Sequence, residues 1–360
     1  AAISEHARAE GVPENVAFER ARRYAREIVP SFSATLYYGF AIRFARFLSR
    51  KLYRVRLGHH AADTLASIDR SATVVFVMNH RSNMDYVLVT YLAAEQSALS
   101  YAVGEWARVW PLSRLIRAMG AYFIRRRSRG ELYRRVLARY VALATEGGVT
   151  QAVFPEGGLS LDGALAKPKL GILRYIVDGY DADVRDVVFI PVAINYDRVF
   201  EDKILVAAGQ RGDRRFGARI SVVVKYIWRI TWRWVTGRYH RFGYAAVSFG
   251  APLSLRAFAG TKPPLIEDLA SDLMRRIGAV VPVLPVPLAA SVFLSAKAPL
   301  SFAAYREAFC AVIEAMPEAH IHAPREDMDY AVEYGLRNLV ARGFVSEAEG
   351  TYSATDEGRP

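Results

Sequence analysis

Residues 73–80, TVVFVMNH, constrain most strongly what this chain can fold into. A continuous run of β-branched, aromatic and aliphatic side chains is typical of a strand buried on both faces, as in a parallel sheet covered by helices. Three further short apolar runs follow, at 120–126, 150–158 and 186–196, and helical patterns separate them. This alternation predicts an α/β fold with a mainly parallel sheet flanked by helices.

Three regions are expected along the chain. Residues 1–58 are predicted to be an N-terminal helical, membrane-proximal region. Residues 59–256 are predicted to form the α/β domain, which includes two later strand-like runs, ISVVVKYIW at 220–228 and YAAVSFG at 244–250. Residues 257–360 are predicted to be a C-terminal helical region that ends in a short β turn.

The chain is basic. Lysine and arginine number 48 against 36 acidic residues, a formal net charge of +12. This excess favours polyanionic partners: nucleic acid, anionic lipid headgroups or phosphorylated substrates. In the segments 31–56 and 218–245 the basic residues are interleaved with aromatic ones, which suits a membrane interface and also a groove for single-stranded nucleic acid. In the first segment Phe40, Phe44 and Leu48 recur on one helical face.

The sequence predicts a protein that lies on a membrane surface without crossing it. No run approaches the ~18 to 20 uninterrupted apolar residues of a spanning helix. The nearest candidate, around residues 35–48, is interrupted by Arg43 and Arg46. No basic-then-apolar leader pattern opens the chain, and the single cysteine, Cys310, cannot form an internal disulfide. We therefore expect the cytoplasmic face of the cell membrane, with peripheral or monotopic attachment.

His80 stands at the end of the first predicted strand, and Asp85 follows five residues later in HRSNMD. Functional groups gather at the carboxyl ends of parallel strands. If a helix begins just after His80, Asp85 lies in its first turn and can hold one imidazole nitrogen, leaving the other to accept a proton from a hydroxyl. An ordinary helix start, with Ser82 as N-cap and Asp85 favoured by the helix dipole, explains the same residues. Taken alone, the pair favours the ordinary helix start.

Two other predicted strands also end in polar or glycine-rich residues. Arg125 and Arg126 follow the second strand, where guanidinium groups can bind a phosphate bidentately. Glu156 ends the third strand and precedes Gly157 and Gly158, which let backbone amides approach a ligand. A solvated arginine-rich face and a plain turn explain these residues equally well.

Four motifs in order resemble the glycerolipid acyltransferase family. They are NHRSNMD, GAYFIRRR, FPEGGLSLDG and IPVAINY, and they cover roughly residues 70–200. The last motif, which contains Pro191, indicates only a core strand when taken alone. Within the family the sequence is most similar to bacterial-type glycerol-3-phosphate acyltransferases, because HRSNMDY, FPEGG followed by KPKLG, and the tail GLRNLVARGFV all match that type.

The resemblance implies a role for each motif. His80 is expected to be the general base that deprotonates the acceptor hydroxyl, with Asp85 as its orienting partner. The acceptor phosphate is expected on Arg125, with Arg126, Lys167 and Lys169 beside it. The acceptor pocket is expected at Glu156, Gly157, Gly158 and Ser160. The acyl-binding side is expected at Pro191. A backbone amide near Gly157 is expected to stabilise the oxyanion.

The implied reaction moves a fatty acyl chain from acyl-CoA or acyl carrier protein to the sn-1 hydroxyl of glycerol-3-phosphate, the first step of phospholipid synthesis. It needs a base and oxyanion stabilisation, but no cofactor, no metal and no covalent enzyme intermediate. One departure concerns the acceptor: Leu159 and Leu161 flank Ser160 where the family commonly has arginines. Lys167 and Lys169 are expected to supply the charge instead. Lysophosphatidate (1-acylglycerol-3-phosphate) therefore stays open as an alternative acceptor.

Two competing classes fit less of the sequence. A nucleic-acid-binding module explains the charge but not the placement of His80, Asp85 and Glu156 at strand ends, so we expect no nucleic-acid partner. A metal hydrolase built on the same three residues lacks a second nearby histidine. The expected partners are a membrane lipid surface, glycerol-3-phosphate and the acyl donor.

Overall fold

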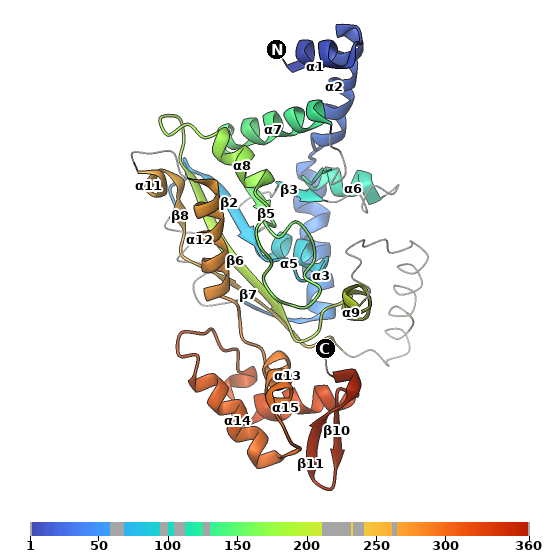
Figure 1. Cartoon of the computed structure of the whole chain (residues 1–360), viewed down its shortest axis with the longest axis vertical. Helices are drawn as coiled ribbons and strands as arrows, with labels where there is room; N and C mark the ends of the chain where they lie inside the picture. Colours follow the sequence, from blue (N-terminus) through green and yellow to red (C-terminus); the bar gives the residue numbers. More distant parts are fainter. Residues whose placement is uncertain are drawn as a thin grey trace.

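The computed structural model describes residues 2–57, 68–93, 100–103, 112–124, 130–210, 232, 241–260 and 265–358. Its centre is one large sheet with the strand order β1-β7-β6-β2-β5-β3-β4, and β8 pairs with β6 beyond the end of β7 (Figure 1). The strands are β1 Arg54–Leu57, β2 Thr73–Met78, β3 Ser100–Val103, β4 Tyr122–Phe123, β5 Gln151–Val153, β6 Val187–Tyr196, β7 Tyr244–Phe249 and β8 Leu253–Ser254.

The sheet is mainly parallel, as predicted. β2 lies between β5 and β6 and is parallel to both, and the pairs β1–β7, β3–β5 and β3–β4 are also parallel. The antiparallel pairs among the described strands of this sheet are β6 with β7 and β6 with β8. The carboxyl ends of β2, β5 and β6 therefore meet at one edge of the sheet.

Helices cover both faces of the sheet because side chains alternate along its buried strands. Phe76 and Met78 of β2 face one side and pack with α3 and α5, whereas Val75 and Val77 face α7, α8 and α12. Figure 1 shows α12 and α5 on opposite sides of β2 and β6. The helices of this part are α1 Ala2–Glu10, α2 Glu14–Ile28, the π-helix η1 Thr35–Ala41, α3 Ile42–Leu52, α5 Met84–Ala93, α6 Leu112–Ala118, α7 Glu131–Glu146, α8 Gly171–Asp178, α9 Asp202–Gln210, α11 Leu255–Ala259 and α12 Ile266–Ala279.

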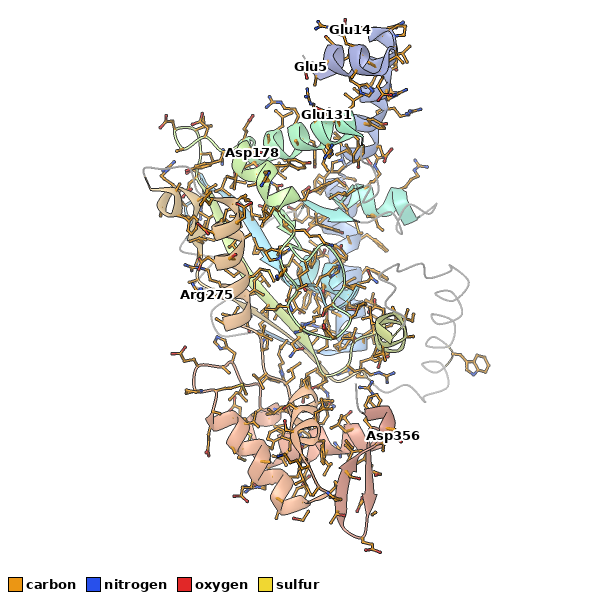
Figure 2. The ribbon with its side chains drawn as sticks, viewed as in Figure 1. Glu5, Glu14, Glu131, Asp178, Arg275 and Asp356 are labelled. Carbon is orange, nitrogen blue, oxygen red and sulfur yellow. The ribbon has the colours of Figure 1, made fainter. Side chains whose placement is uncertain are left out.

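The first two helices pack against α7. Arg135 of α7 forms ion pairs with Glu5 of α1 and, at 2.6 Å, with Glu131 one turn earlier. Both glutamates are labelled in Figure 2. These groups are exposed, so the pairs fix the position of α1 more than they contribute to stability.

Helix α3 turns its large aromatic side chains outward. Ala45, Ser49 and Leu52 are buried, and this face packs against α5. Phe44 and Phe47, by contrast, are 47% and 53% exposed. Small residues on the inner face let the two helices approach closely, while the apolar area of the helix is left on the surface.

The C-terminal region builds its own core below the sheet in Figure 1. It consists of α13 Pro285–Ser295, β9 Leu300–Ser301, α14 Phe302–Glu314, the 3-10 turn η3 Pro324–Glu326, α15 Met328–Ala341, β10 Val345–Ala348, β11 Thr351–Ala354 and the short η4 Asp356–Gly358. Its three strands form a small antiparallel sheet with the order β10-β11-β9. Tyr244 and Ala246 of β7 belong to the same core, which joins this region to the large sheet.

A buried carboxylate strengthens that junction. Asp197, just after β6, accepts the backbone N–H of Tyr244 at 2.8 Å and that of Val286 in α13 at 3.2 Å. Burial raises the pKa of Asp197 to about 6, although these hydrogen bonds act in the opposite direction.

Three element predictions need comment. The helical prediction up to residue 58 is wrong at β1, where RVRL forms an edge strand. The strand β3 was not predicted, because a loop and a helix were expected there. The run at 244–250 forms β7, whereas 220–228 lies outside the described residues. The region boundaries at 58 and 256 stay predictions.

Candidate active site

His80 and Asp85 lie where β2 ends and α5 begins. Both are buried, with 3% and 0% of their surface exposed. His80 Nδ1 lies 2.9 Å from Asp85 Oδ2. Because a carboxylate only accepts, Nδ1 carries the proton of the neutral ring and Nε2 is left as the basic nitrogen. Within the described part of the chain, Nε2 has no hydrogen-bond partner. The geometry suits a proton acceptor.

Four hydrogen bonds hold the carboxylate of Asp85. Besides His80, Oδ2 accepts the backbone N–H groups of Arg81 at 2.7 Å and Ser82 at 3.0 Å. Oδ1 accepts the hydroxyl of Tyr196 at 2.6 Å. Asp85 also lies in the first turn of α5, where the helix dipole favours a negative charge. The helix start and the histidine–aspartate pair, which the sequence offered as alternatives, are thus present together.

The turn between His80 and α5 is braced by a second buried carboxylate. Ser82 Oγ accepts the N–H of Met84 at 3.0 Å and donates to Glu201 Oε2 at 2.6 Å. Glu201 Oε1 accepts the N–H of Asn83 at 3.1 Å. Burial raises the pKa of Glu201, and its hydrogen bonds to Ser82 and Asn83 oppose that shift.

Asn79 extends the pairing of β2 with β6. Its side-chain amide donates to the carbonyl of Ile194 at 2.9 Å and accepts the N–H of Ile194 at 2.8 Å. The side chain thus replaces a backbone pairing that ends at Met78. These two hydrogen bonds fix the residue before His80 and so position His80 relative to the end of the sheet.

Glu156 connects the end of β5 to this turn. Oε1 accepts the N–H of His80 at 2.9 Å, and Oε2 accepts the N–H of Ala166 at 3.0 Å. The N–H of Ser160 donates to the carbonyl of His80 at 2.8 Å. Both oxygens of Glu156 therefore bind the backbone, so its observed contacts shape the loop at 156–166 from within.

Gly157 takes a conformation that side chains rarely adopt, with φ of 63°. A Cβ atom added there would lie 2.7 Å from Cδ of Lys169. Its N–H donates to the carbonyl of Phe154 at 3.0 Å and is not free for a ligand. The N–H of Gly158, by contrast, makes no hydrogen bond to any described residue. Lys167 and Lys169 are exposed on the same loop.

Arg81 is a further charged residue of this site. Its guanidinium donates to the carbonyl of Gly163, and its Nε is buried without a partner among the described residues. Burial lowers its pKa, while the negative charges of Glu156, Asp85 and Asp162 favour the charged form. Arg81 thus ties the loop after β5 to the residue next to His80.

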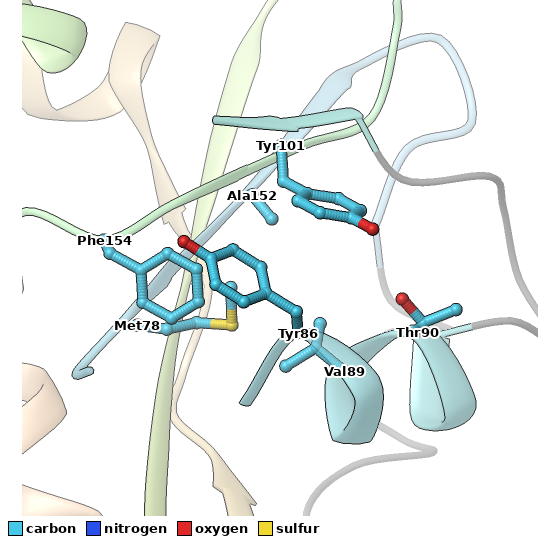
Figure 3. A pocket seen from close by; sticks show the side chains of 7 residues that line it. All are labelled: Met78, Tyr86, Val89, Thr90, Tyr101, Ala152 and Phe154. Atoms are coloured by element: carbon cyan, nitrogen blue, oxygen red, sulfur yellow. The ribbon is translucent and has the colours of Figure 1, made fainter. Parts of the chain in front are cut away.

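A narrow apolar hollow, too closely packed to admit a water molecule, lies beside His80. Met78, Tyr86, Val89, Thr90, Tyr101, Ala152 and Phe154 line it (Figure 3). The rings of Phe154 and Tyr86 also contact the His80 ring, with centroids 4.2 and 5.4 Å away. Figure 3 shows the rings of Tyr86 and Phe154 next to each other, with the hydroxyl of Tyr101 pointing toward Thr90. The basic nitrogen and an apolar space are therefore neighbours.

The comparisons with known proteins agree with this geometry. Residues 60–195 match the family model described as "Acyltransferase", and residues 233–356 match "Glycerol-3-phosphate acyltransferase C-terminal region". The chain thus carries a match to an acyltransferase domain, followed by a match to the C-terminal region of glycerol-3-phosphate acyltransferases. The first match contains His80, Asp85 and Glu156 but ends just before Tyr196, and the second begins before β7 and contains most of the C-terminal region.

Curated relatives carry the name glycerol-3-phosphate acyltransferase. One from Xylella fastidiosa is 29% identical over 82% of this chain and 36% of its own length. Another, from Xanthomonas campestris, is 30% identical over 78% of this chain and 33% of its own. This chain thus spans about a third of the length of these relatives. A solved 1-acyl-sn-glycerophosphate acyltransferase, PlsC from Thermotoga maritima, aligns with 66% of this chain and 77% of its own at 18% identity, with a TM-score of 0.42.

Not every expected site residue of this chain lies near His80. Pro191 is buried in β6 opposite Val77, on the sheet face away from Met78 and the hollow. Proline has no N–H to donate, and Pro191 lies between the residues of β6 that pair with β7 and those that pair with β8. Its carbonyl accepts the N–H of Gly250 at 2.8 Å. The contacts of Pro191 are thus those of a strand residue. Arg125 and Arg126 lie outside the described residues.

Sequence reasoning missed Arg81, Tyr196, Glu201 and the hollow. Arg81 and Tyr196 stand inside quoted motifs, so their position was a usable signal. Glu201 gave no signal, because only the sheet order brings it to Ser82 across 119 positions of the chain. Among the described residues, no group of three or more histidine, cysteine or acidic side chains is arranged to hold a metal ion. Likewise, no described helix combines the length and apolarity required for crossing a membrane.

Proposed function

We propose that this chain transfers a fatty acyl group from an acyl thioester to the sn-1 hydroxyl of glycerol-3-phosphate, with His80 as general base. The observation that carries the proposal is the buried pair of His80 and Asp85 at the carboxyl end of β2, inside the stretch that matches the acyltransferase family model. The name of the curated relatives and the second family match support glycerol-3-phosphate as the acceptor.

In the proposed reaction, Nε2 of His80 removes the proton from the acceptor hydroxyl as its oxygen attacks the thioester carbonyl. Asp85 holds Nδ1–H and stabilises the imidazolium that forms. The N–H of Gly158 is placed to stabilise the oxyanion. When the C–S bond breaks, the imidazolium returns the proton to the departing thiolate, so the free thiol and the ester are the products.

The acyl chain is proposed to enter between the apolar side chains that line the hollow beside His80, which must move apart to admit it; the contact of the Phe154 ring with the His80 ring supports this choice. This assignment differs from the expectation for Pro191, which lies on the other face. Enlarging the side chain at Ala152, at the back of the hollow, should shift the preference toward shorter acyl chains. Unchanged chain-length preference in a folded Ala152→Leu variant would contradict this placement.

The acceptor phosphate is proposed to bind Arg125 and Arg126 together with Lys167 and Lys169. Both lysines are on the loop that Glu156 connects to the backbone of His80, so the loop that carries the positive charge is hydrogen-bonded to the proposed base. Arg125→Ala should raise the KM for glycerol-3-phosphate far more than the KM for the acyl donor. An equal effect on both would indicate a structural role for this arginine.

Lysophosphatidate is the second candidate acceptor, because Leu159 and Leu161 stand where arginines are common in the family. The deciding experiment supplies labelled glycerol-3-phosphate or lysophosphatidate with long-chain acyl-CoA, then with acyl carrier protein as donor, beside His80→Ala. Product from glycerol-3-phosphate that is reduced by about 10² to 10⁴ in a folded His80→Ala variant supports the proposal. Product only from lysophosphatidate moves the substrate, and no product with either donor removes the proposed activity.

We also propose that the protein binds the cytoplasmic face of the cell membrane as a peripheral or monotopic protein. Phe40 and Phe44 stack on each other, 5.6 Å apart, and both are 47% exposed next to the exposed Arg43. Aromatic rings beside cationic groups suit the headgroup layer of an anionic membrane. The other candidate contact, residues 218–245, lies mostly outside the described residues.

Co-sedimentation with phosphatidylglycerol-containing vesicles at low salt tests the membrane proposal. The Phe40→Ser/Phe44→Ser variant should bind less, while Leu294→Ser/Phe302→Ser, which removes two exposed apolar groups of the C-terminal region, should bind normally. Equal binding by both variants would refute η1 and α3 as the contact. Steeply salt-dependent DNA binding without vesicle binding would favour a nucleic-acid-binding module instead.

A further inference from the structure

The segment that follows β6 reaches back to the helix start that holds the proposed base. Tyr196 is the last residue of β6, and its side chain points to the face that carries His80, as those of Ile190 and Ile194 do. Its ring is buried and its hydroxyl donates to Asp85 Oδ1 at 2.6 Å. Residues more than a hundred positions apart in the chain thus meet on one carboxylate.

The two oxygens of Asp85 have different partners. Oδ2 accepts from His80 and from two backbone N–H groups, which the turn itself supplies. Oδ1 accepts from Tyr196, the one other side-chain donor to Asp85 among the described residues. Removing that hydroxyl would leave Oδ1 without this partner in a site with no exposed surface, so the carboxylate would lose both an anchor and a neutralising dipole.

Tyr196 is suited to act as a permanent donor. Burial, and secondarily the charge of Asp85, raise its pKa well above the ordinary value, so the hydroxyl stays protonated at every working pH. A short O–H···O⁻ bond draws negative charge toward Oδ1 and away from Oδ2. The imidazolium of His80 is then stabilised less strongly than it would be by an unshared carboxylate.

We propose that Tyr196 is a positioning residue that acts through Asp85 to set the orientation and the basicity of His80. The inference rests on the proposed role of His80 as the base. The buried hydroxyl of Tyr196 donates to Asp85 and not to His80, so its effect is expected in the behaviour of His80 and not in substrate binding.

Tyr53 provides a matched control. It is buried like Tyr196, and the two rings pack with centroids 5.1 Å apart. The hydroxyl of Tyr53 donates to the backbone carbonyl of Arg198 at 3.0 Å. Tyr53→Phe and Tyr196→Phe therefore each remove one hydroxyl from neighbouring buried rings. Only the hydroxyl of Tyr196 is hydrogen-bonded to Asp85.

The test measures kcat, both KM values and the pH dependence of kcat/KM for both variants. Tyr196→Phe should lower kcat about tenfold, leave both KM values near those of the wild type, and move the acidic limb of the profile to higher pH because His80 becomes more basic. Tyr53→Phe should keep the wild-type profile. Identical profiles for the two variants would overturn the inference, as would a rise in acceptor KM with unchanged kcat.

A second readout separates this inference from the proposed function. Isotope-labelled histidine lets NMR follow the titration of His80, assigned by its loss in His80→Ala. A higher His80 pKa in Tyr196→Phe than in Tyr53→Phe supports the inference even if no acyl transfer is found. An unchanged His80 pKa refutes it even if the enzyme is active.

Discussion

Asp85 allows a sharp test, because replacing its carboxylate by an amide and by a methyl group should have different consequences. In Asp85→Asn the amide oxygen can take the place of Oδ2, where it still accepts from His80 and from two backbone N–H groups. The amide nitrogen then faces Tyr196, whose hydroxyl can turn to accept. The fold and the tautomer of His80 are kept, but the charge that stabilises the imidazolium is lost.

We therefore expect Asp85→Asn to lose only about 1 to 3 kcal/mol of unfolding free energy, from the Tyr196 hydroxyl that no longer has its acceptor, while kcat falls about 10² to 10⁴. In Asp85→Ala the donors of His80, Tyr196 and two backbone amides lose their acceptor in a fully buried place. At roughly 1 to 3 kcal/mol for each unsatisfied donor, with some relief from entering water, the loss of unfolding free energy should be about 3 to 6 kcal/mol.

Urea denaturation and the acyl-transfer assay, run on the same preparations, decide between these outcomes. Near-normal turnover in Asp85→Asn would refute the electrostatic role of this residue. An Asp85→Ala variant as stable as the wild type would show that the four hydrogen bonds do not hold the turn. Both results together would remove Asp85 from the site.

Three further predictions follow from single contacts. Gly157→Ala should lower the unfolding free energy by roughly 1 to 2 kcal/mol because its backbone is left-handed. It should also raise the acceptor KM, because the added Cβ displaces Lys169. Gly350→Ala is the control: with φ of 76° and open space around it, it should show the loss of stability alone. Glu156→Gln sets an NH2 group against a backbone N–H, so kcat and stability should both fall, the latter by about 1 to 3 kcal/mol in urea unfolding; unchanged values would contradict the bracing role. The pKa of Asp197 in the folded state lies at about 6, above its ordinary 3.8, so the folded state binds this proton more tightly than the unfolded state does. The unfolding free energy should therefore fall by roughly 3 kcal/mol as pH rises from near 4 through 6. Asp197→Asn should lack this fall, and the same pH dependence in both proteins would refute the raised pKa of Asp197.

The sequence predicted those parts of the fold that depend on local pattern. The run at 73–78 is apolar throughout because helices cover both sides of β2, and this signal needs no partner to be recognised. The strand at 54–57 was not predicted, because RVRL at a sheet edge keeps its charged side chains in solvent and continues the basic pattern of α3. The four residues of β3 were too short to show a period.

The same division applies to the candidate site. His80 and Asp85 are five positions apart, so a strand end followed by a helix start is enough to bring them together. The contact of Tyr196 with Asp85 spans 111 positions and depends on β6 lying next to β2, which no local pattern reveals. Pro191 lies on the sheet face away from Met78 because one step along a strand changes the face on which a side chain lies, and its place on the acyl-binding side stays a prediction.

The edge strand β1 has a practical consequence for shortening this protein. β1 is the outermost strand and covers one side of β7 with a parallel pairing from Arg54 to Leu57. A version trimmed at residue 58 to remove the exposed aromatic helix would expose a row of unpaired backbone groups along β7, which invites association between copies. A version that begins at Tyr53 would keep that edge covered, but it would uncover the apolar side chains of α5 and β2 against which α3 packs, so shortening the chain there exchanges one exposed apolar surface for another.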